Sequence, residues 1–245
     1  MSNNIPSWMK SGATANAELV KEDEKAQARQ SMYDQQKNRV FPFFIKPGEE
    51  AEITFLDGDL IEEGADAGIL DLLTYRQHTV NVGGKWQDFV CTSDTEPCPI
   101  CAEDNTPAYV GVFTVIDHSS YISKTNGKEY KDTQKLFVAK RGTLKKLQKY
   151  ATKFGGLRGL TFEVSRDDQK GARVGTDFIT NGVKKTDAEL ESLYGPNSKP
   201  VDYGEAITYL TAKELNALGI GNPISGVGGS YTPVAVNDDE GSIPF

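Results

Sequence analysis

Residues 74–92, TYRQHTVNVGGKWQDFVCT, form two runs of alternating β-type residues joined by a pair of glycines. Two glycines between such runs predict a β-hairpin whose two-residue loop is Gly83–Gly84. Counting outward from this loop places His78 opposite Phe89. Because side chains alternate along a strand, Cys91 then lies on the same face as His78, about 7–8 Å away at the backbone.

The chain has three cysteines, and the other two, Cys98 and Cys101, follow in the segment EPCPIC at 96–101. A CxxC pair stiffened by prolines predicts a tight turn that presents both thiolates to one ion. Three thiolates and one imidazole make a closed tetrahedral shell of the structural zinc kind. We therefore predict a structural Zn²⁺ bound by His78, Cys91, Cys98 and Cys101.

A redox or deaminase role for these cysteines has less support. A thioredoxin-like CxxC opens a helix after a strand in a βαβ unit, and no such pattern surrounds residues 98–101. Zinc deaminases need a His-x-Glu motif, but neither His78 nor His118, the two histidines of the chain, begins one. Cysteines that only pack in a core are the plainest alternative, and His118 is a second candidate ligand in place of His78.

Short runs of β-type residues separated by turn signals recur between residues 39 and 180, whereas few segments have helical periodicity. One turn signal is Asn126-Gly127, which predicts a second hairpin. Helices are predicted at 143–154 and 211–219. This pattern is typical of a mainly β protein, a small barrel or sandwich with a few short helices.

The two ends of the chain differ from its centre in composition. Residues 13–37 are rich in helix formers but lack an apolar stripe, so residues 1–38 are predicted to be a flexible arm with an exposed helix. Residues 219–245 begin with Gly- and Pro-rich sequence, which predicts a flexible linker and an acidic tail. The predicted core is then 39–218, with a zinc subdomain at about 75–105.

Charge is segregated along the chain. The 245 residues have a formal net charge of −8, but residues 121–185 contain 16 Lys and Arg against 6 Asp and Glu, a local charge of +10. This asymmetry predicts a basic binding surface and acidic segments that modulate it. No apolar run is long enough to cross a bilayer and no secretion signal is visible, so we expect a cytoplasmic protein without a membrane partner.

Residues 238–245, DDEGSIPF, combine three acids with an apolar end. We expect the acids to fill the basic surface when nucleic acid is absent, and the apolar residues to dock in a pocket of a partner protein. The residues assigned to this partner contact are Asp238, Asp239, Glu240, Ile243, Pro244 and Phe245.

The spacing His-x12-Cys-x6-Cys-x2-Cys resembles the zinc site of the single-stranded DNA-binding, helix-destabilising proteins of T-even phages. The segment DDEGSIPF resembles the tail of bacterial single-stranded DNA-binding proteins. These resemblances imply an OB-fold-like small β-barrel with an inserted zinc-binding hairpin. They also imply sequence-independent, non-enzymatic binding of single-stranded DNA during phage DNA replication, recombination and repair in an infected bacterial host.

The same resemblances imply the partners. The tail would recruit replication or recombination proteins such as a polymerase, helicase or primase, and copies of the protein would self-associate on DNA. The chain departs from the T-even family in residues 1–38, which hold five basic and five acidic residues where that family has a basic arm.

A sequence-tolerant single-strand binder needs cations along the phosphates and flat side chains for base stacking. Interleaved cations and aromatics lie at 39–46, on the hairpin 75–91, around Asn126-Gly127 and along 140–149. We predict that zinc holds the hairpin as one wall of a basic groove. The predicted DNA contacts are Arg39, Phe43, Lys46, Arg76, Trp86, Tyr121, Lys124, Lys128, Tyr130, Lys131, Lys135, Lys140, Arg141, Lys145, Lys146 and Lys149.

Two other functions compete with this one. A zinc-containing nucleic-acid enzyme such as a nuclease needs clustered carboxylates. Its candidate residues are typical of solvated acids in a loop, and they are Asp57, Asp59, Glu62 and Glu63. A zinc-stabilised adaptor that binds only protein would show no quenching of Trp86 fluorescence by oligo-dT.

Overall fold

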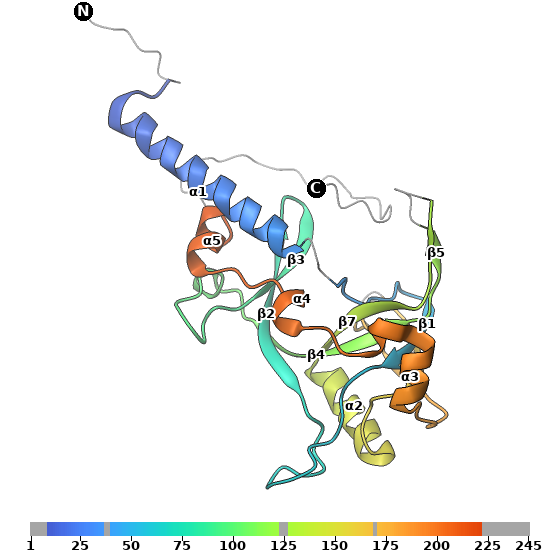
Figure 1. Cartoon of the computed structure of the whole chain (residues 1–245). Coiled ribbons are helices and arrows are strands. Elements are labelled where there is room, and N and C mark those ends of the chain that lie inside the picture. Colours follow the sequence, from blue (N-terminus) through green and yellow to red (C-terminus); the bar gives the residue numbers. More distant parts are fainter. Residues whose placement is uncertain (1–8, 37–39, 123–126, 169–170, 222–245) are drawn as a thin grey trace, which may run out of the picture.

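A computed structural model of the chain describes residues 9–36, 40–122, 127–168 and 171–221 (Figure 1). It is a mixed α/β protein built on a mostly antiparallel sheet of seven strands. None of the described helices is long and apolar enough to cross a membrane. The strands of the large sheet are β1 (Glu50–Phe55), β2 (Leu73–Val82), β3 (Lys85–Val90), β4 (Ala108–Asp117), β7 (Thr133–Lys140), β8 (Thr161–Ser165) and β9 (Asp177–Ile179).

Strand β4 organises this sheet. The first half of one edge pairs with β2 and the second half pairs with β1, while β7 pairs along the other edge. From these pairs the sheet continues outward to β3 on one side and through β8 to β9 on the other, in the order β3-β2-β4-β1-β8-β9. The alternation in the sequence therefore predicted the strands correctly. It could not show that three of them, β1, β2 and β7, all pair with the long strand β4.

The sheet is mostly antiparallel, as the expected small β-barrel requires, but it is not closed into a barrel. The free edge of β7 is occupied by an irregular segment: the Phe43 amide donates to the Leu136 carbonyl at 2.8 Å, and the Leu136 amide donates to Phe41 at 3.0 Å. The Ile45 amide then donates to the carbonyl of Arg173, between β8 and β9, at 2.8 Å. Residues 41–45 thus lie where a barrel would pair β7 with β9.

The main core fills the curve of the sheet under helix α2 (Arg141–Phe154). The helix buries Leu144, Leu147 and Ala151, which recur on one face, and it ends at Gly155 in the left-handed region with φ 73°. It approaches β4 closely, since a Cβ at Gly111 would lie 2.7 Å from a methyl carbon of Leu144. The predicted helix at 143–154 is confirmed and begins two residues earlier.

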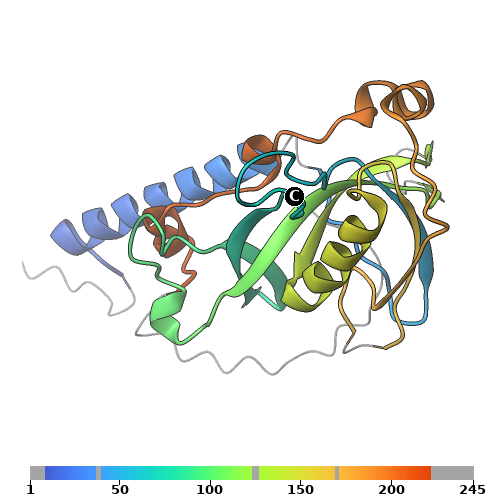
Figure 2. The ribbon, with the colours of Figure 1, turned by 90° about the horizontal axis from the view of Figure 1, so that it is seen from below.

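The other helices lie outside this core, and they make the protein less β-rich than expected. Helix α1 (Gly12–Gln36) projects from the body and contacts α5 (Ala212–Ala217) near its end (Figure 2). It buries Ala28, so the helix predicted at 13–37 forms but is not wholly exposed. The remaining elements are α3 (Asp187–Tyr194), α4 (Tyr203–Ala206), the 3₁₀ turns Cys101–Glu103 and Gly195–Ser198, and the small hairpin of β5 (Tyr121–Ile122) and β6 (Glu129–Tyr130).

Candidate metal centre and cationic surfaces

The β2–β3 hairpin has the predicted register. Gly83 and Gly84 both have positive φ, 61° and 86°, as a tight two-residue loop requires. His78 pairs with Phe89, and the Cys91 amide donates to the Arg76 carbonyl at 2.8 Å, which extends the ladder past the end of β3. His78 and Cys91 are therefore diagonal neighbours on one face, as the sequence predicted.

A chain of tight turns brings the CxxC pair back to this face. The amides of Thr95 and Glu96 both donate to the Thr92 carbonyl, at 2.9 and 2.8 Å. The next turn is the short 3₁₀ helix that begins at Cys101, closed by Asp104 in the left-handed region at φ 57°. The turns return Cys98 and Cys101 to the imidazole, so that the ligand atoms of His78, Cys91, Cys98 and Cys101 all lie within 4.8 Å of one another.

The spacing of these atoms fits zinc. A tetrahedral ion with Zn–S near 2.3 Å and Zn–N near 2.0–2.1 Å separates its ligands by about 3.8 Å for S···S and about 3.5 Å for S···N. In the protein Cys91 Sγ lies 3.6 Å from Cys101 Sγ. His78 Nε2 lies 3.5 Å from Cys98 Sγ and 3.4 Å from Cys101 Sγ. The buried cluster is therefore suited to a metal ion such as zinc.

The imidazole of His78 is fully buried and held in the orientation that such an ion needs. Its Nδ1 lies 3.0 Å from Oδ1 of Asn105, and the amide nitrogen of Asn105 donates to the Thr79 carbonyl at 3.2 Å. With Nδ1–H donating to Asn105, Nε2 keeps its lone pair and faces the sulfur atoms. No sequence pattern points to Asn105, because its role depends on a turn that returns it to β2.

The thiols differ in how readily they ionise. Burial by itself raises the pKa of Cys98, but backbone N–H groups of Cys101 and Thr92 donate to its sulfur and lower the pKa to about 6. Burial and the neighbouring thiols Cys91 and Cys98 raise the pKa of Cys101 to about 12. One thiolate therefore forms easily in this pocket, whereas three together require a cation among them.

Residues 91–104, which carry the three cysteines and which we call the metal loop, lie at the centre of a small second core. Cys91, Cys98 and Ile100 pack with Leu215 and Ile220, the latter just after α5. Hydrogen bonds reinforce this packing. The Ala212 amide donates to Oε1 of Glu96 at 2.7 Å, Ser31 of α1 donates to Glu214 at 2.8 Å, and the hydroxyls of Thr95 and Tyr209 are 2.7 Å apart. The candidate metal thus lies beneath α5 and the end of α1.

The predicted aromatic contacts divide into exposed and buried rings. Phe43 is wrong as a DNA contact, because it is only 3% exposed and stacks on Phe137 in the main core. Phe41, which shares its face of the segment but lies beyond the edge of the core, is 53% exposed. Sequence alternation assigns both rings to one face and cannot show where the core ends along it.

Phe41 belongs to a surface group that we call the tyrosine–lysine cluster. Its members are Phe41, Tyr121, Lys128, Tyr130 and Lys135. The rings of Tyr121 and Tyr130, a cross-strand pair of β5 and β6, are stacked with centroids 5.3 Å apart and planes 14° apart. Lys135 Nζ lies 5.4 Å from the ring centre of Phe41 and 5.6 Å from that of Tyr121. Lys128 lies over Tyr130 at 5.5 Å. The structure thereby joins residues that the sequence had assigned to two separate groups.

Other predicted contacts lie apart from this cluster. Arg76 and Trp86 are both exposed, but the register puts them on opposite faces of the β2–β3 hairpin. Lys140, Arg141, Lys145 and Lys149 are exposed at and along α2, which Figure 1 shows below the sheet while β5 extends above it. Lys146 contacts the Thr176 carbonyl and lies 4.0 Å from Asp177. The predicted cations therefore do not form one compact patch.

Two more of the predicted DNA contacts, Lys46 and Lys131, are exposed. Arg39, Lys124 and the whole partner-binding set of the tail lie outside the described residues, and that set is Asp238, Asp239, Glu240, Ile243, Pro244 and Phe245.

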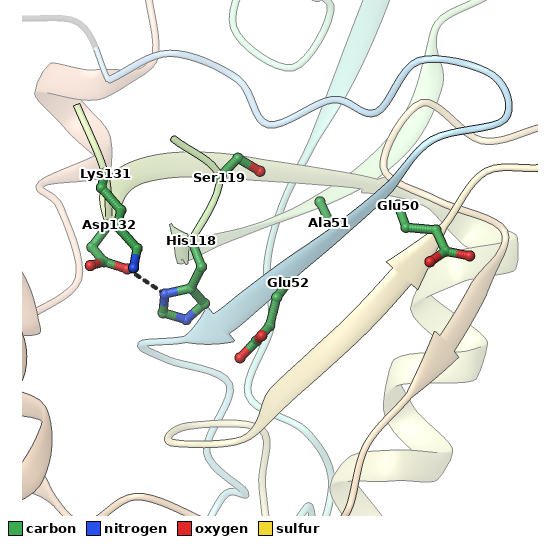
Figure 3. Close-up of a pocket in the computed structure, with 7 residues that line it drawn as sticks. All are labelled: Glu50, Ala51, Glu52, His118, Ser119, Lys131 and Asp132. Atoms are coloured by element: carbon green, nitrogen blue, oxygen red, sulfur yellow. Dashed lines mark hydrogen bonds and ion pairs between the residues drawn. The ribbon is translucent and has the colours of Figure 1, made fainter. Parts of the chain in front are cut away.

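His118 does not belong to the metal cluster. It lines a pocket of about 380 Å³ with Glu50, Glu52, Lys131 and Asp132, among others (Figure 3). Its Nδ1 lies 2.6 Å from Asp132 Oδ1, and its Nε2 lies 2.8 Å from the hydroxyl of the fully buried Thr54. Both ring nitrogens are occupied, as expected for a histidine with a structural role.

The carboxylates proposed for a nuclease do not converge either. Asp57 accepts hydrogen bonds from the Thr114 amide, at 3.1 and 3.2 Å, and from the Tyr203 hydroxyl. Asp59, Glu62 and Glu63 are exposed. Within the described part of the chain, the His/Cys cluster is the one group of three or more acidic, histidine or cysteine side chains placed to hold a metal.

Comparison with known proteins identifies no family. No protein-family model matches the chain, and no curated protein matches it in sequence.

Proposed function

We propose that the protein binds single-stranded DNA without regard to sequence and coats it, without catalysis. The observation that carries this proposal is the tyrosine–lysine cluster: the rings of Phe41 and Tyr121 are exposed, Tyr130 stacks on Tyr121, and ammonium groups lie over these rings. Such rings stack on any base, each stack contributing about 1–3 kcal/mol, while the cations follow the phosphates. The local excess of basic residues at 121–185, which includes β5, β6 and β7, supports the same ligand.

Lys135 is the residue of the cluster best placed to bind a phosphate. It lies over two aromatic rings, and its burial lowers its pKa, although Asp117 opposes that shift. A partly desolvated ammonium gains more from a nearby phosphate than one already surrounded by water. A nucleotide whose base stacks on Tyr121 would bring a phosphate to this position.

The connectivity of the sheet supports an OB-fold within the protein. With the β2–β3 and β5–β6 hairpins set aside, β1, β4 and β7 come in this order along the chain, followed by α2, β8 and β9. These five strands form an antiparallel unit that is open on one side. OB-folds are partly open barrels that bind oligonucleotides on strands 2 and 3 and on the adjoining loops. By this correspondence β4 and β7 form the binding face, and the β2–β3 hairpin is an insertion between the first two strands.

The proposed role of zinc is structural. Four protein ligands close the coordination shell and leave no position for a substrate, so the ion would fix the hairpin and not perform chemistry. In a phage single-stranded DNA-binding protein used in replication, recombination and repair, residues 238–245 would recruit a polymerase, helicase or primase, and neighbouring copies would self-associate on the strand.

The test is a titration of fluorescent oligo-dT at two salt concentrations, with a duplex of equal length as control. We expect tight binding to the single strand, weaker binding to the duplex, and a log–log salt slope of about −0.7 per phosphate contact. Tyr121→Ala should weaken binding about 5- to 100-fold, since it removes one stacking ring, whereas Leu193→Ala, which removes an exposed apolar side chain from α3, should change it little.

Three results would contradict the proposal. They are equal affinity for single strand and duplex, no effect of Tyr121→Ala, and cleavage of the labelled strand in magnesium. The last result would favour a nuclease.

A further inference from the structure

One ion pair joins the two ends of the open sheet. Asp88 lies on β3, the first strand in the sheet order, and Arg173 lies between β8 and β9, at the other end. Arg173 Nη1 is 3.6 Å from Asp88 Oδ2. The sheet is therefore curved far enough for β3 to approach the β8–β9 loop at Arg173, and we call this place of contact the seam.

The backbone of Arg173 is held by its neighbours, whereas its side chain is largely exposed. Its carbonyl accepts the Ile45 amide, and its neighbours Ala172 and Val174 pack against the main core. Gly175 follows with φ +105°, and a Cβ there would lie 2.1 Å from a Val164 methyl carbon, so the loop cannot shift easily. The Arg173 side chain is 58% exposed.

Asp88 is held in place by a second contact. The Thr79 hydroxyl, across the hairpin, donates to Asp88 Oδ1 at 2.7 Å, which leaves Oδ2 for Arg173. At 3.6 Å this ion pair is too long for a good hydrogen bond, and exposed pairs of this kind contribute little to stability. A phosphodiester offers the same guanidinium two oxygen atoms at hydrogen-bonding distance and is a better ligand for it.

The surroundings of the pair suit a nucleotide. Trp86 is two residues before Asp88 on β3, hence on the same face, and its ring is exposed. The segment that bonds to the Arg173 backbone also carries the exposed Phe44 and Lys46. Exposed aromatic rings that could stack on a base therefore lie on both sides of the seam, and Lys46 adds a cation to Arg173 on one of them.

We propose that Arg173 is a phosphate-binding residue of the single-strand site and that Asp88 takes the place of the phosphate in the free protein. This inference rests on the proposed function. Binding would exchange the carboxylate for a phosphodiester, opening the contact between β3 and the β8–β9 loop so that the strand crosses the seam. Because Asp88 competes with the phosphodiester for Arg173, it would weaken the binding of every ligand at this position.

The experiment measures oligo-dT affinity for the full chain and for the variants Arg173→Gln, Asp88→Asn and their combination. We expect Arg173→Gln to weaken binding about 10-fold and to reduce the salt slope by about 0.7. Asp88→Asn should strengthen binding about 2- to 5-fold, because it removes the competitor but keeps a group that accepts from Thr79. In the Arg173→Gln background, Asp88→Asn should gain no more than any loss of one exposed negative charge gives.

Asp94→Asn is the matched control, since it removes the same charge from an exposed site on the metal loop. Its gain should be smaller than that of Asp88→Asn. Equal gains from both, an Asp88→Asn gain above that of Asp94→Asn that persists without Arg173, or unchanged affinity of Arg173→Gln would overturn the inference. Arg173→Lys, which keeps the charge, serves if the glutamine variant fails to fold, and it should weaken binding because it loses the bidentate fork. Failure of the unchanged protein to bind oligo-dT would instead overturn the proposed function, and this inference with it.

Discussion

The main sheet and the metal loop are stabilised in different ways. Among the described residues, the main core joins eighteen buried side chains, including six stacked, tilted or edge-on phenylalanines at its centre. The core around the metal loop has seven, and two of these are the candidate ligands Cys91 and Cys98. Burial of apolar surface is sufficient to explain the first region. The second has too few apolar groups for independent stability, and such small units commonly depend on a metal.

Removal of the metal tests this difference most strongly. Structural zinc contributes about 10–16 kcal/mol to small zinc domains, so chelation should unfold the metal loop and the hairpin beside it while the rest of the sheet persists. Hydrogen exchange followed by mass spectrometry should show loss of protection in β3, in the half of β2 that pairs with β3, in α5 and in the second half of α1, because all of them adjoin the second core. Protection of β4, β7 and β8 should remain.

Cys98→Ser should reproduce the pattern without chelator, and metal analysis should find one zinc per unmodified chain. His118→Gln is the control, since His118 is the histidine outside the cluster. It should retain the zinc and the protection of α5. Unchanged exchange in α5 after complete loss of zinc would show that the second core is stable by itself.

The same division explains what the sequence could predict. Hairpin register depends on local alternation and on the Gly83–Gly84 turn, so the ligand cluster followed from counting residues. The unclosed barrel could not be predicted, because it depends on where residues 41–45 settle after the strands have paired. The fate of Phe43 and the pairing of Asp88 with Arg173 are equally non-local. Local patterns thus predicted the metal site better than the surface around the sheet.

Asp57 is a buried carboxyl group next to the main sheet, and its ionisation makes the free energy of unfolding depend on pH. Burial raises its pKa from 3.8 to about 6, despite the hydrogen bond from Tyr203. Because the folded protein holds this proton more tightly than the unfolded chain, the stabilising contribution is complete below pH 4 and is lost as the pH rises to about 6. The loss is at most about 3 kcal/mol.

Urea unfolding of the protein and of Asp57→Asn at pH 5 and pH 7.5 measures this effect. The variant should gain stability relative to the unchanged protein as the pH rises, and the comparison cancels the pH dependence of metal binding that both share. Glu62→Gln, at an exposed site in the same loop, should show no such gain. A stability difference that is constant between the two pH values would show that Asp57 is ordinarily solvated.

Asn105 provides the finest test of the metal site, because it changes no ligand. It accepts from His78 Nδ1 and donates to the Thr79 carbonyl, and so fixes the imidazole with Nε2 toward the sulfur atoms. Removing such a partner typically weakens metal binding 10- to 100-fold, about 1.4–2.7 kcal/mol. Asn105→Ala should show this loss in competition with a chromophoric chelator, and Asn105→Asp, which still accepts from Nδ1, should recover most of it. If the alanine variant binds zinc as tightly as the unchanged protein, the ring is held by packing alone and the hydrogen bond is incidental.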